Sequence, residues 1–178
     1  ETNIGRRNQK AMLGVSGEGS PHEEVSASSL DDPAIIPARY AHLFRVGYSI
    51  SSFPPVTGNA VRLMADSEST IDSIVEDIDA AQHEVNVLFY IWLKDNSGVR
   101  VAEALMRAAD RGVVCRALVD SLGSRSFIRS RLWRELKAAG VHTSIALPLG
   151  NFFLRPLQGR VDLRNHRKII VMDGQITY

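Results

Sequence analysis

A histidine and a lysine two residues apart, His166 and Lys168, are the residues whose types and spacing best suit chemistry. They lie in a stretch of alternating and β-branched residues, 164–178, that predicts a strand ending at the turn formers Asp173 and Gly174. On a strand this spacing puts both side chains on one face, with Cα atoms about 6.6 Å apart. An imidazole can attack phosphorus while a neighbouring ammonium neutralises the phosphoryl oxygens. The pair therefore predicts phosphoryl-transfer chemistry that needs no metal ion and no cofactor.

Asp173 is predicted to have a different role from the histidine. A straight strand would carry it about 23 Å from His166, with its side chain on the opposite face. We therefore expect Asp173 to be structural, either in a hairpin turn or between lobes, and another acid to orient the imidazole. Asp120 and Asp162 are both candidates for that acid, and the sequence does not choose between them.

The surroundings of the pair matter because an arbitrary H-x-K is most simply two solvated residues of an amphipathic strand. Here the stretch resembles the motif H-x-K-x(4)-D of the phospholipase D superfamily, with His166, Lys168 and Asp173 at the required spacing. The apolar run IIVM inside the motif, and the flanking Asn165 and Gly174, also match the usual context of that family.

Landmarks upstream narrow the resemblance to the bacterial cardiolipin synthases. These landmarks occur in the expected order over the last two-thirds of the chain: Gly58 and Asn59, then FYIW with Asp95 and Gly98, VDSLGS, and LPLGNFFLRP before DLRNHRK. The resemblance implies a two-step phosphatidyl transfer in which His166 forms a phosphohistidine and a second alcohol collects the phosphatidyl group. It implies phosphatidylglycerol as both donor and acceptor, and cardiolipin and glycerol as products.

The resemblance also implies a larger protein than this chain. Synthases of this kind carry two such motifs in two lobes, one histidine acting as nucleophile and the other as general acid. This chain contains one motif. We therefore expect it to be the first lobe, truncated at its C-terminal end and inactive alone. The complete protein is expected at the bacterial cytoplasmic (inner) membrane, with its anchor absent from this chain.

Three further residues are candidates for substrate binding: Arg155, Arg125 and Asn165. The loop DSLGSRS could offer backbone amides and Arg125 to a phosphate, although a strand-to-helix turn capped by Ser explains it equally well. In NFFLRPL, the apolar side chains could enter a membrane surface while Arg155 meets lipid phosphates. The alternative is that both Phe side chains of that stretch close the core.

The elements that must position these residues form a βα pattern from residue 57 onward. Apolar strands are predicted over 60–66, 84–92, 113–120 and 141–149, and amphipathic helices over 70–82, 98–111 and 127–139. This predicts an α/β fold, a mainly parallel mixed sheet with helices on its faces, that is one lobe of a phospholipase D-like fold. Residues 57–178 would make this lobe. The final strand QITY is expected to lack a partner.

Residues 1–56 predict a polar arm or linker with a short helix over 38–46. The single Cys115, with apolar neighbours, indicates a buried side chain in a reducing compartment. No run of 18 or more uncharged apolar residues occurs in the sequence, so no transmembrane helix is predicted. Trp92 and Trp133 are expected to be core and helix-packing aromatics.

Two rival functions stay open at this point. A phosphodiesterase or endonuclease of the same superfamily could complete its site as a homodimer of single-motif chains. A formal net charge of +1 argues against nucleic acid, because backbone neutralisation needs several Lys or Arg contacts. The Arg-rich segment SRSFIRSRLWRELK favours this rival, but helical spacing scatters its arginines over more than one face. The third reading is a non-enzymatic fragment that binds membranes.

Overall fold

The computed structural model describes residues 36–53, 55, 57–147, 164 and 166–178, and the chain divides into two compact units, Glu1–Arg62 and Leu63–Tyr178. In the first unit a short 3-10 helix, η2 (Ala38–Tyr40), leads into α2 (Ala41–Ser51). The expected helix over 38–46 therefore forms and continues to Ser51. It ends because Ser52 adopts a left-handed conformation, with φ of 62°.

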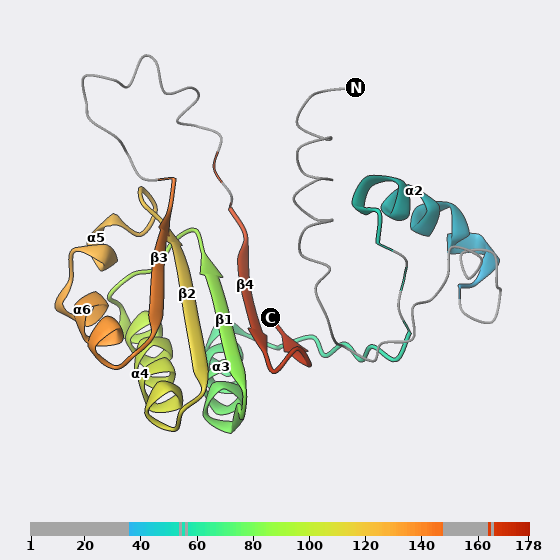
Figure 1. Ribbon diagram of the computed structural model, residues 1–178. Helices are drawn as coiled ribbons and strands as arrows, with labels where there is room; N and C mark the ends of the chain where they lie inside the picture. The colour runs from blue at the N-terminus through green and yellow to red at the C-terminus, as the bar shows by residue number, and fades with distance from the viewer. Residues whose placement is uncertain (1–35, 54, 56, 148–163, 165) are drawn as a thin grey trace, which may run out of the picture. The chain divides into compact units, whose positions relative to one another are not determined.

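A five-stranded sheet is the centre of the second unit (Figure 1). Its strands are β1 (Glu84–Phe89), β2 (Val114–Asp120), β3 (His142–Ala146), β4 (Lys168–Met172) and β5 (Ile176–Thr177), in the spatial order β3-β2-β1-β4-β5. The strand pairs β1–β2 and β2–β3 are parallel, whereas β4 is antiparallel to both β1 and β5. The predicted α/β class with a mixed sheet and a parallel core is confirmed.

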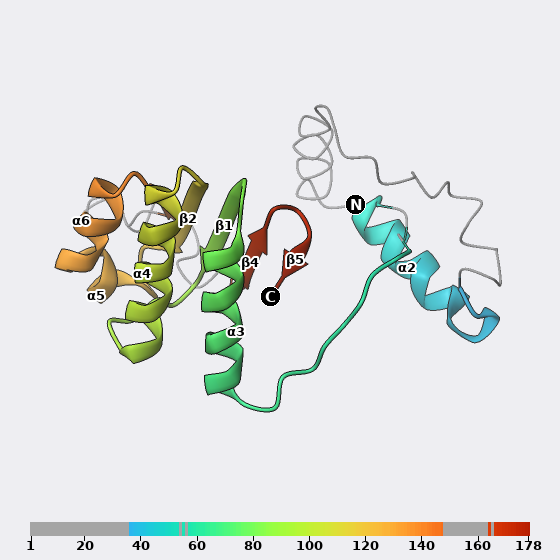
Figure 2. The same cartoon turned by 90° about the horizontal axis from the view of Figure 1, so that it is seen from below.

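The helices of this unit are α3 (Ser67–Ala80), α4 (Asn96–Asp110), α5 (Arg125–Ile128) and α6 (Arg131–Ala138). Figure 2 shows that these four helices lie on one side of the sheet. The sequence pattern had predicted helices on its faces. The strands agree with this arrangement, because Val85 and Val87 of β1 are buried while the alternating residues Asn86 and Leu88 are only partly covered. One face of the sheet therefore forms the core.

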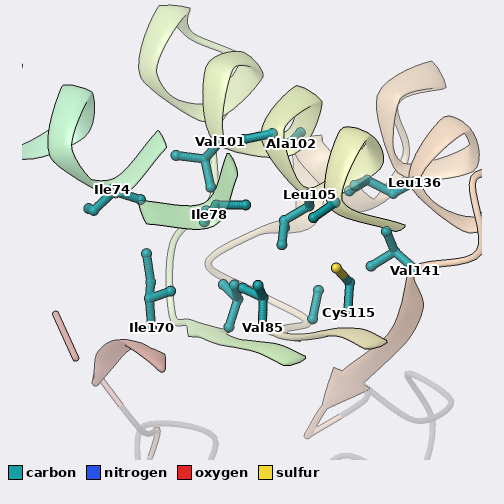
Figure 3. Packing of buried hydrophobic residues seen from close by; sticks show 14 of the residues in the cluster. Ile74, Ile78, Val85, Val101, Ala102, Leu105, Cys115, Leu136, Val141 and Ile170 are labelled. Carbon is teal, nitrogen blue, oxygen red and sulfur yellow. The ribbon is translucent and has the colours of Figure 1, made fainter. Parts of the chain in front are cut away.

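The core lies between this face and the helices, and Figure 3 shows part of it. Ile78, Leu105, Val85 and Leu136 have no or almost no exposed surface. The prediction of a buried thiol is confirmed, since Cys115 is 1% exposed and burial raises its pKa to about 11. Trp92 and Trp133 are buried as expected.

The strand predicted over 60–66 is wrong. These residues form neither strand nor helix, and Val61 and Leu63 are 95% and 96% exposed. An alternating pattern produces a strand only where a neighbouring strand accepts its backbone hydrogen bonds. In the described sheet the two edges of β1 are taken by β2 and β4. Asp66 instead caps α3, accepting a hydrogen bond from the Ser69 N–H at 2.7 Å.

The helix predicted over 127–139 forms as two shorter helices. The break falls at Ser130, whose N–H donates to the Phe127 carbonyl at 2.9 Å. The Ser130 hydroxyl then accepts the Trp133 N–H at 3.2 Å and caps the start of α6. Serine favours this cap position over a helix interior, because its side chain competes for backbone groups.

The prediction that QITY lacks a partner is also wrong. Asp173 and Gly174, with φ of 51° and 64°, reverse the chain so that β5 pairs with β4. Tyr178 and Ile170 exchange two backbone hydrogen bonds of 3.0 Å. The Tyr178 hydroxyl donates to Asp77 of α3 at 2.6 Å. Strands β4 and β5 therefore form a hairpin, with β5 at one edge of the sheet.

Candidate active site

His166 and Lys168 lie at the carboxyl end of β1. Lys168 begins β4 and lies opposite Phe89, the last residue of β1. One step further, the Tyr90 N–H donates to the Arg167 carbonyl at 3.2 Å, so the pairing continues beyond the strand ends. The His166 ring stacks on the Tyr90 ring, with centroids 4.1 Å apart and planes inclined by 14°. The imidazole is thus exposed to solvent on one side and held by an aromatic ring on the other.

Lys168 borders an apolar pocket of about 220 Å³. Its walls come from α3, from the start of α4 and from the segment after β1, and include Ile71, Ile74, Val101, Ile91, Trp92 and Leu93. Gly98 lets the segment after β1 pack closely on the start of α4, because an added Cβ there would clash with the Leu93 carbonyl oxygen. A cation at the rim of an apolar pocket suits a ligand that has both a phosphate and a hydrocarbon part.

A buried ion pair anchors the segment that leads into His166. Arg164 donates to both carboxylate oxygens of Asp120 at 2.8 Å, and each side chain is 5% exposed. The same carboxylate accepts the N–H groups of Leu122 and Gly123 at 2.8 and 3.0 Å. Burial alone would raise the pKa of Asp120, but the Gly123 N–H and the Arg164 guanidinium hold it below its usual value.

The loop after β2 also holds Tyr90. The Ser124 hydroxyl donates to the Tyr90 carbonyl at 3.1 Å and accepts the Trp92 N–H at 2.9 Å. Gly123 packs directly on the same carbonyl, since an added Cβ would lie 2.3 Å from the Tyr90 oxygen. One loop thus contacts the backbone of the residue under His166 and, through Asp120, the chain just before His166.

This bonding removes one interpretation of the DSLGSRS loop. The backbone N–H groups of residues 121–125 all donate within the protein, to Asp120, Leu122 and Ala146. They are therefore not available as a cradle of amides for a phosphate. The alternative of an ordinary strand-to-helix turn describes the loop, but its predicted Ser cap is wrong, because the hydroxyl of Ser124 bonds Tyr90 and Trp92 and not the first turn of α5. The Arg125 side chain lies exposed at the start of α5.

Asp173 lies at the opposite end of β1 from His166. Its carboxylate accepts the N–H groups of Gln82, His83 and Glu84 at 2.9, 2.8 and 2.8 Å, and its own N–H donates to the Glu84 carbonyl at 2.9 Å. The Gln82 hydrogen bond is the largest influence on the pKa of this carboxyl; it and the bonds from Glu84 and His83 together outweigh burial and hold the pKa below its usual value. The turn of the hairpin is thereby joined to the start of the central strand.

Several of the site residues predicted from the sequence lie outside the residues that the structure describes. They are Arg155, Asn165 and Asp162, together with the NFFLRPL segment. Asp120, one of the two acids considered for orienting the imidazole, bonds Arg164 instead. The sequence reasoning missed Arg164 and the stacking role of Tyr90. Their place in DLRNHRK and FYIW, two landmarks of the resemblance, was the available signal.

A mixed α/β lobe with His166 and Lys168 at the carboxyl end of its central strand defines a phospholipase D-like domain. The profile of the family described as "Cardiolipin synthase, PLD-like domain" matches residues 74–178, and the chain belongs to this family. It is 42% identical over 125 residues to cardiolipin synthase A of Proteus mirabilis, covering 69% of this chain and 25% of that one. It is 40% identical over 136 residues to cardiolipin synthase A of Erwinia tasmaniensis, covering 76% and 28%.

The chain thus spans about a quarter of the length of the curated relatives it matches. Among solved structures, polyphosphate kinase from Porphyromonas gingivalis aligns with 59% of this chain and 15% of its own, at 16% identity and a TM-score of 0.39. A likeness of that size carries no argument. Across the residues that the structure describes, no helix combines the length and the apolar character needed to cross a membrane.

Proposed function

We propose that this chain is the nucleophile-bearing lobe of a cardiolipin synthase, an enzyme that makes cardiolipin and glycerol from two phosphatidylglycerol molecules. The observation that carries the proposal is the arrangement at the end of β1, where His166 stacks on Tyr90 and Lys168 begins the adjacent strand. The identity to cardiolipin synthase A relatives over most of the chain supports the same substrate class.

The proposed reaction has two displacements at one phosphorus atom. In the first, a ring nitrogen of His166 attacks the phosphorus of phosphatidylglycerol, a P–N bond forms, and the P–O bond to the head-group glycerol breaks. The leaving oxygen takes a proton from a general acid, which we expect to be the histidine of a second lobe. In the second, a glycerol hydroxyl of another phosphatidylglycerol gives its proton to that second-lobe histidine and attacks phosphorus; a new P–O bond forms, the P–N bond breaks and the imidazole is released. Lys168 offsets the charge of the phosphoryl oxygens in both.

Roles for the other site residues follow from what they contact. Asp173 is proposed to be structural, since its carboxylate is occupied by three backbone N–H groups at the far end of β1. Arg125, Arg155 and Asn165 are proposed to bind the substrate phosphate or head group, Arg125 through its exposed side chain. The complete protein is proposed to act at the bacterial cytoplasmic membrane, where its lipid substrate is found.

The apolar pocket beside Lys168 favours a lipid over a nucleic acid as the substrate. Its walls are mostly hydrocarbon, with Asp95, Ser97 and Lys168 as the polar residues, which suits the carbon chains of a phospholipid better than a sugar-phosphate strand. Several arginines of the described surface are also paired with carboxylates, among them Arg100 with Glu68 and Arg116 with Glu84. The Arg-rich segment still exposes Arg125, Arg129 and Arg134, so the preference for a lipid rests on the pocket and on the relatives rather than on charge pairing.

The test uses the complete protein, which would include a second motif, with purified phosphatidylglycerol as substrate. His166→Ala should abolish cardiolipin formation and the acid-quenched phosphohistidine, while the fold is kept and the melting temperature falls by no more than the loss of the Tyr90 stacking explains. Lys168→Ala should lower the rate about a hundredfold, the usual cost of a lost contact to a developing oxyanion. Near-normal cardiolipin synthesis by the His166→Ala enzyme would refute the proposal.

The 178-residue chain provides the second arm of the test. We expect it to be inactive alone towards phosphatidylglycerol, because the general acid of the second lobe is needed to protonate the leaving glycerol. A stable dimer of this chain that cleaves DNA and ignores phosphatidylglycerol would favour the single-motif nuclease instead. Two copies can supply both histidines where one cannot.

A further inference from the structure

The first unit contains a helix whose apolar side chains face solvent. No residue of α2 is buried, and Leu43, Val46 and Ile50 are 57%, 56% and 81% exposed. Phe44 within the helix and Phe53 just after it are 42% and 58% exposed. A helix of a globular protein normally covers its apolar side chains against a core, so this exposure indicates an uncovered binding surface.

These side chains gather on one side of the helix. At the α-helical repeat, Leu43, Phe44, Val46 and Ile50 fall within one broad arc, whereas His42, Arg45 and Ser49 fall on the other side. After the left-handed residue Ser52 the chain turns, and a groove of about 420 Å³ runs along the apolar side between the helix and Phe53 and Pro55. The apolar surface is therefore continuous from the helix into the following residues.

The charges of this segment select the kind of partner. Residues 36–53 include Arg39, His42 and Arg45 and contain no Asp or Glu. The Arg39 guanidinium lies 4.6 Å from the centre of the Tyr40 ring, so an aromatic and a cation sit together where the helix begins. A wide apolar arc, a cationic polar side and an aromatic at the boundary are the features of helices that lie in the surface of an anionic membrane.

We propose that α2, extended by Tyr40 and Phe53, is an interfacial helix that inserts its apolar side into the surface of an anionic bilayer. The apolar side chains would enter the boundary between head groups and acyl chains, and Arg39 and Arg45 would lie at the level of the lipid phosphates. This surface belongs to a different unit from His166, and its binding to lipid does not depend on the proposed reaction.

The purified 178-residue chain tests this by flotation with vesicles of equal parts phosphatidylglycerol and phosphatidylcholine, compared with vesicles of phosphatidylcholine alone. The wild-type chain should float with the anionic vesicles, and binding should fall at high salt. Leu43→Gln/Ile50→Gln should weaken binding at least tenfold. The matched control Ser49→Gln places the same residue on the polar side of the helix and should bind like wild type. Neither variant disturbs a buried residue of α2.

The outcomes separate this proposal from its alternatives. Failure of the wild-type chain to float, or undiminished flotation of the Leu43→Gln/Ile50→Gln variant, would overturn it. The second result would assign membrane contact elsewhere, for example to the FFL segment at 152–154. A chain that self-associates in solution through the same side chains, without binding vesicles, would show that α2 docks on protein. A His166→Ala chain should float normally, so this test does not share its outcome with the activity assay.

Discussion

Arg164 and Asp120, 44 residues apart in the chain, form an ion pair whose side chains are each only 5% exposed. The pair joins the carboxyl end of β2 to the segment that ends at His166. Removing one partner would leave the other charged and buried, which typically costs about 3–5 kcal/mol. The pair therefore positions the approach to His166.

We expect Asp120→Asn and Arg164→Gln each to lower the free energy of unfolding of the lobe by about 3–5 kcal/mol in denaturant titrations. The double variant should be less destabilised than the sum of the two, because it leaves no unpaired charge. Arg131→Gln, in the highly exposed pair with Glu135, is the control and should change stability by less than about 1 kcal/mol. Simple additivity of the two buried substitutions would contradict the coupling.

Asp173 should make stability depend on pH. Its folded-state pKa is depressed, so the unfolded chain binds protons more readily and stability falls as pH decreases. The contribution is complete well above the ordinary carboxyl pKa of about 3.9 and is lost as pH falls through that value and then through the lower folded value. Asp120 acts in the same direction.

Asp173→Asn should therefore destabilise the lobe by about 2 kcal/mol at pH 7 and reduce the loss of stability between pH 5 and 3. Asn tolerates the left-handed backbone, so this variant isolates the carboxylate. Thermal unfolding across this pH range is the measurement. In the complete enzyme, a variant that melts like wild type yet never forms the phosphohistidine would show that Asp173 acts in the chemistry instead.

Tyr90 should matter through its ring. Tyr90→Leu in the complete enzyme removes the stacking surface under His166, an interaction typically worth about 0.5–1.5 kcal/mol, or up to about tenfold in rate. The rate of phosphohistidine formation should fall by that factor at saturating lipid, with KM little changed. Tyr90→Phe keeps the ring and should retain the rate. Equal loss in both variants would point to the hydroxyl instead.

Gly123→Ala should disturb the same support from the backbone side. The new Cβ would lie 2.3 Å from the Tyr90 carbonyl oxygen, so the loop or Tyr90 must move. We expect a loss of about 1–3 kcal/mol in stability, together with slower phosphohistidine formation in the complete enzyme. Gly47→Ala is the control, because no atom lies within 4 Å of its new Cβ. A Gly123→Ala lobe as stable as wild type would contradict the close packing.

Much of the fold could be predicted because its signals are local. The apolar spacing of α3 and α4, the alternation of β1 and β2 and the Asp173–Gly174 turn are properties of neighbouring residues, and these elements form within a few residues of where the sequence places them. Residues 60–66 show the limit of the same reasoning. They are also rich in apolar residues, but without a neighbouring strand no sheet hydrogen bonds form.

The sequence by itself determined which groups could carry the proposed chemistry, since the spacing of His166 and Lys168 is a covalent fact. Only the tertiary structure decided which groups surround them. Arg164 finds Asp120, and Asp173 finds the N–H of His83 90 residues away, because β4 enters the sheet antiparallel beside β1. Partners distant in sequence meet through strand order and packing, which no local pattern of residue types encodes.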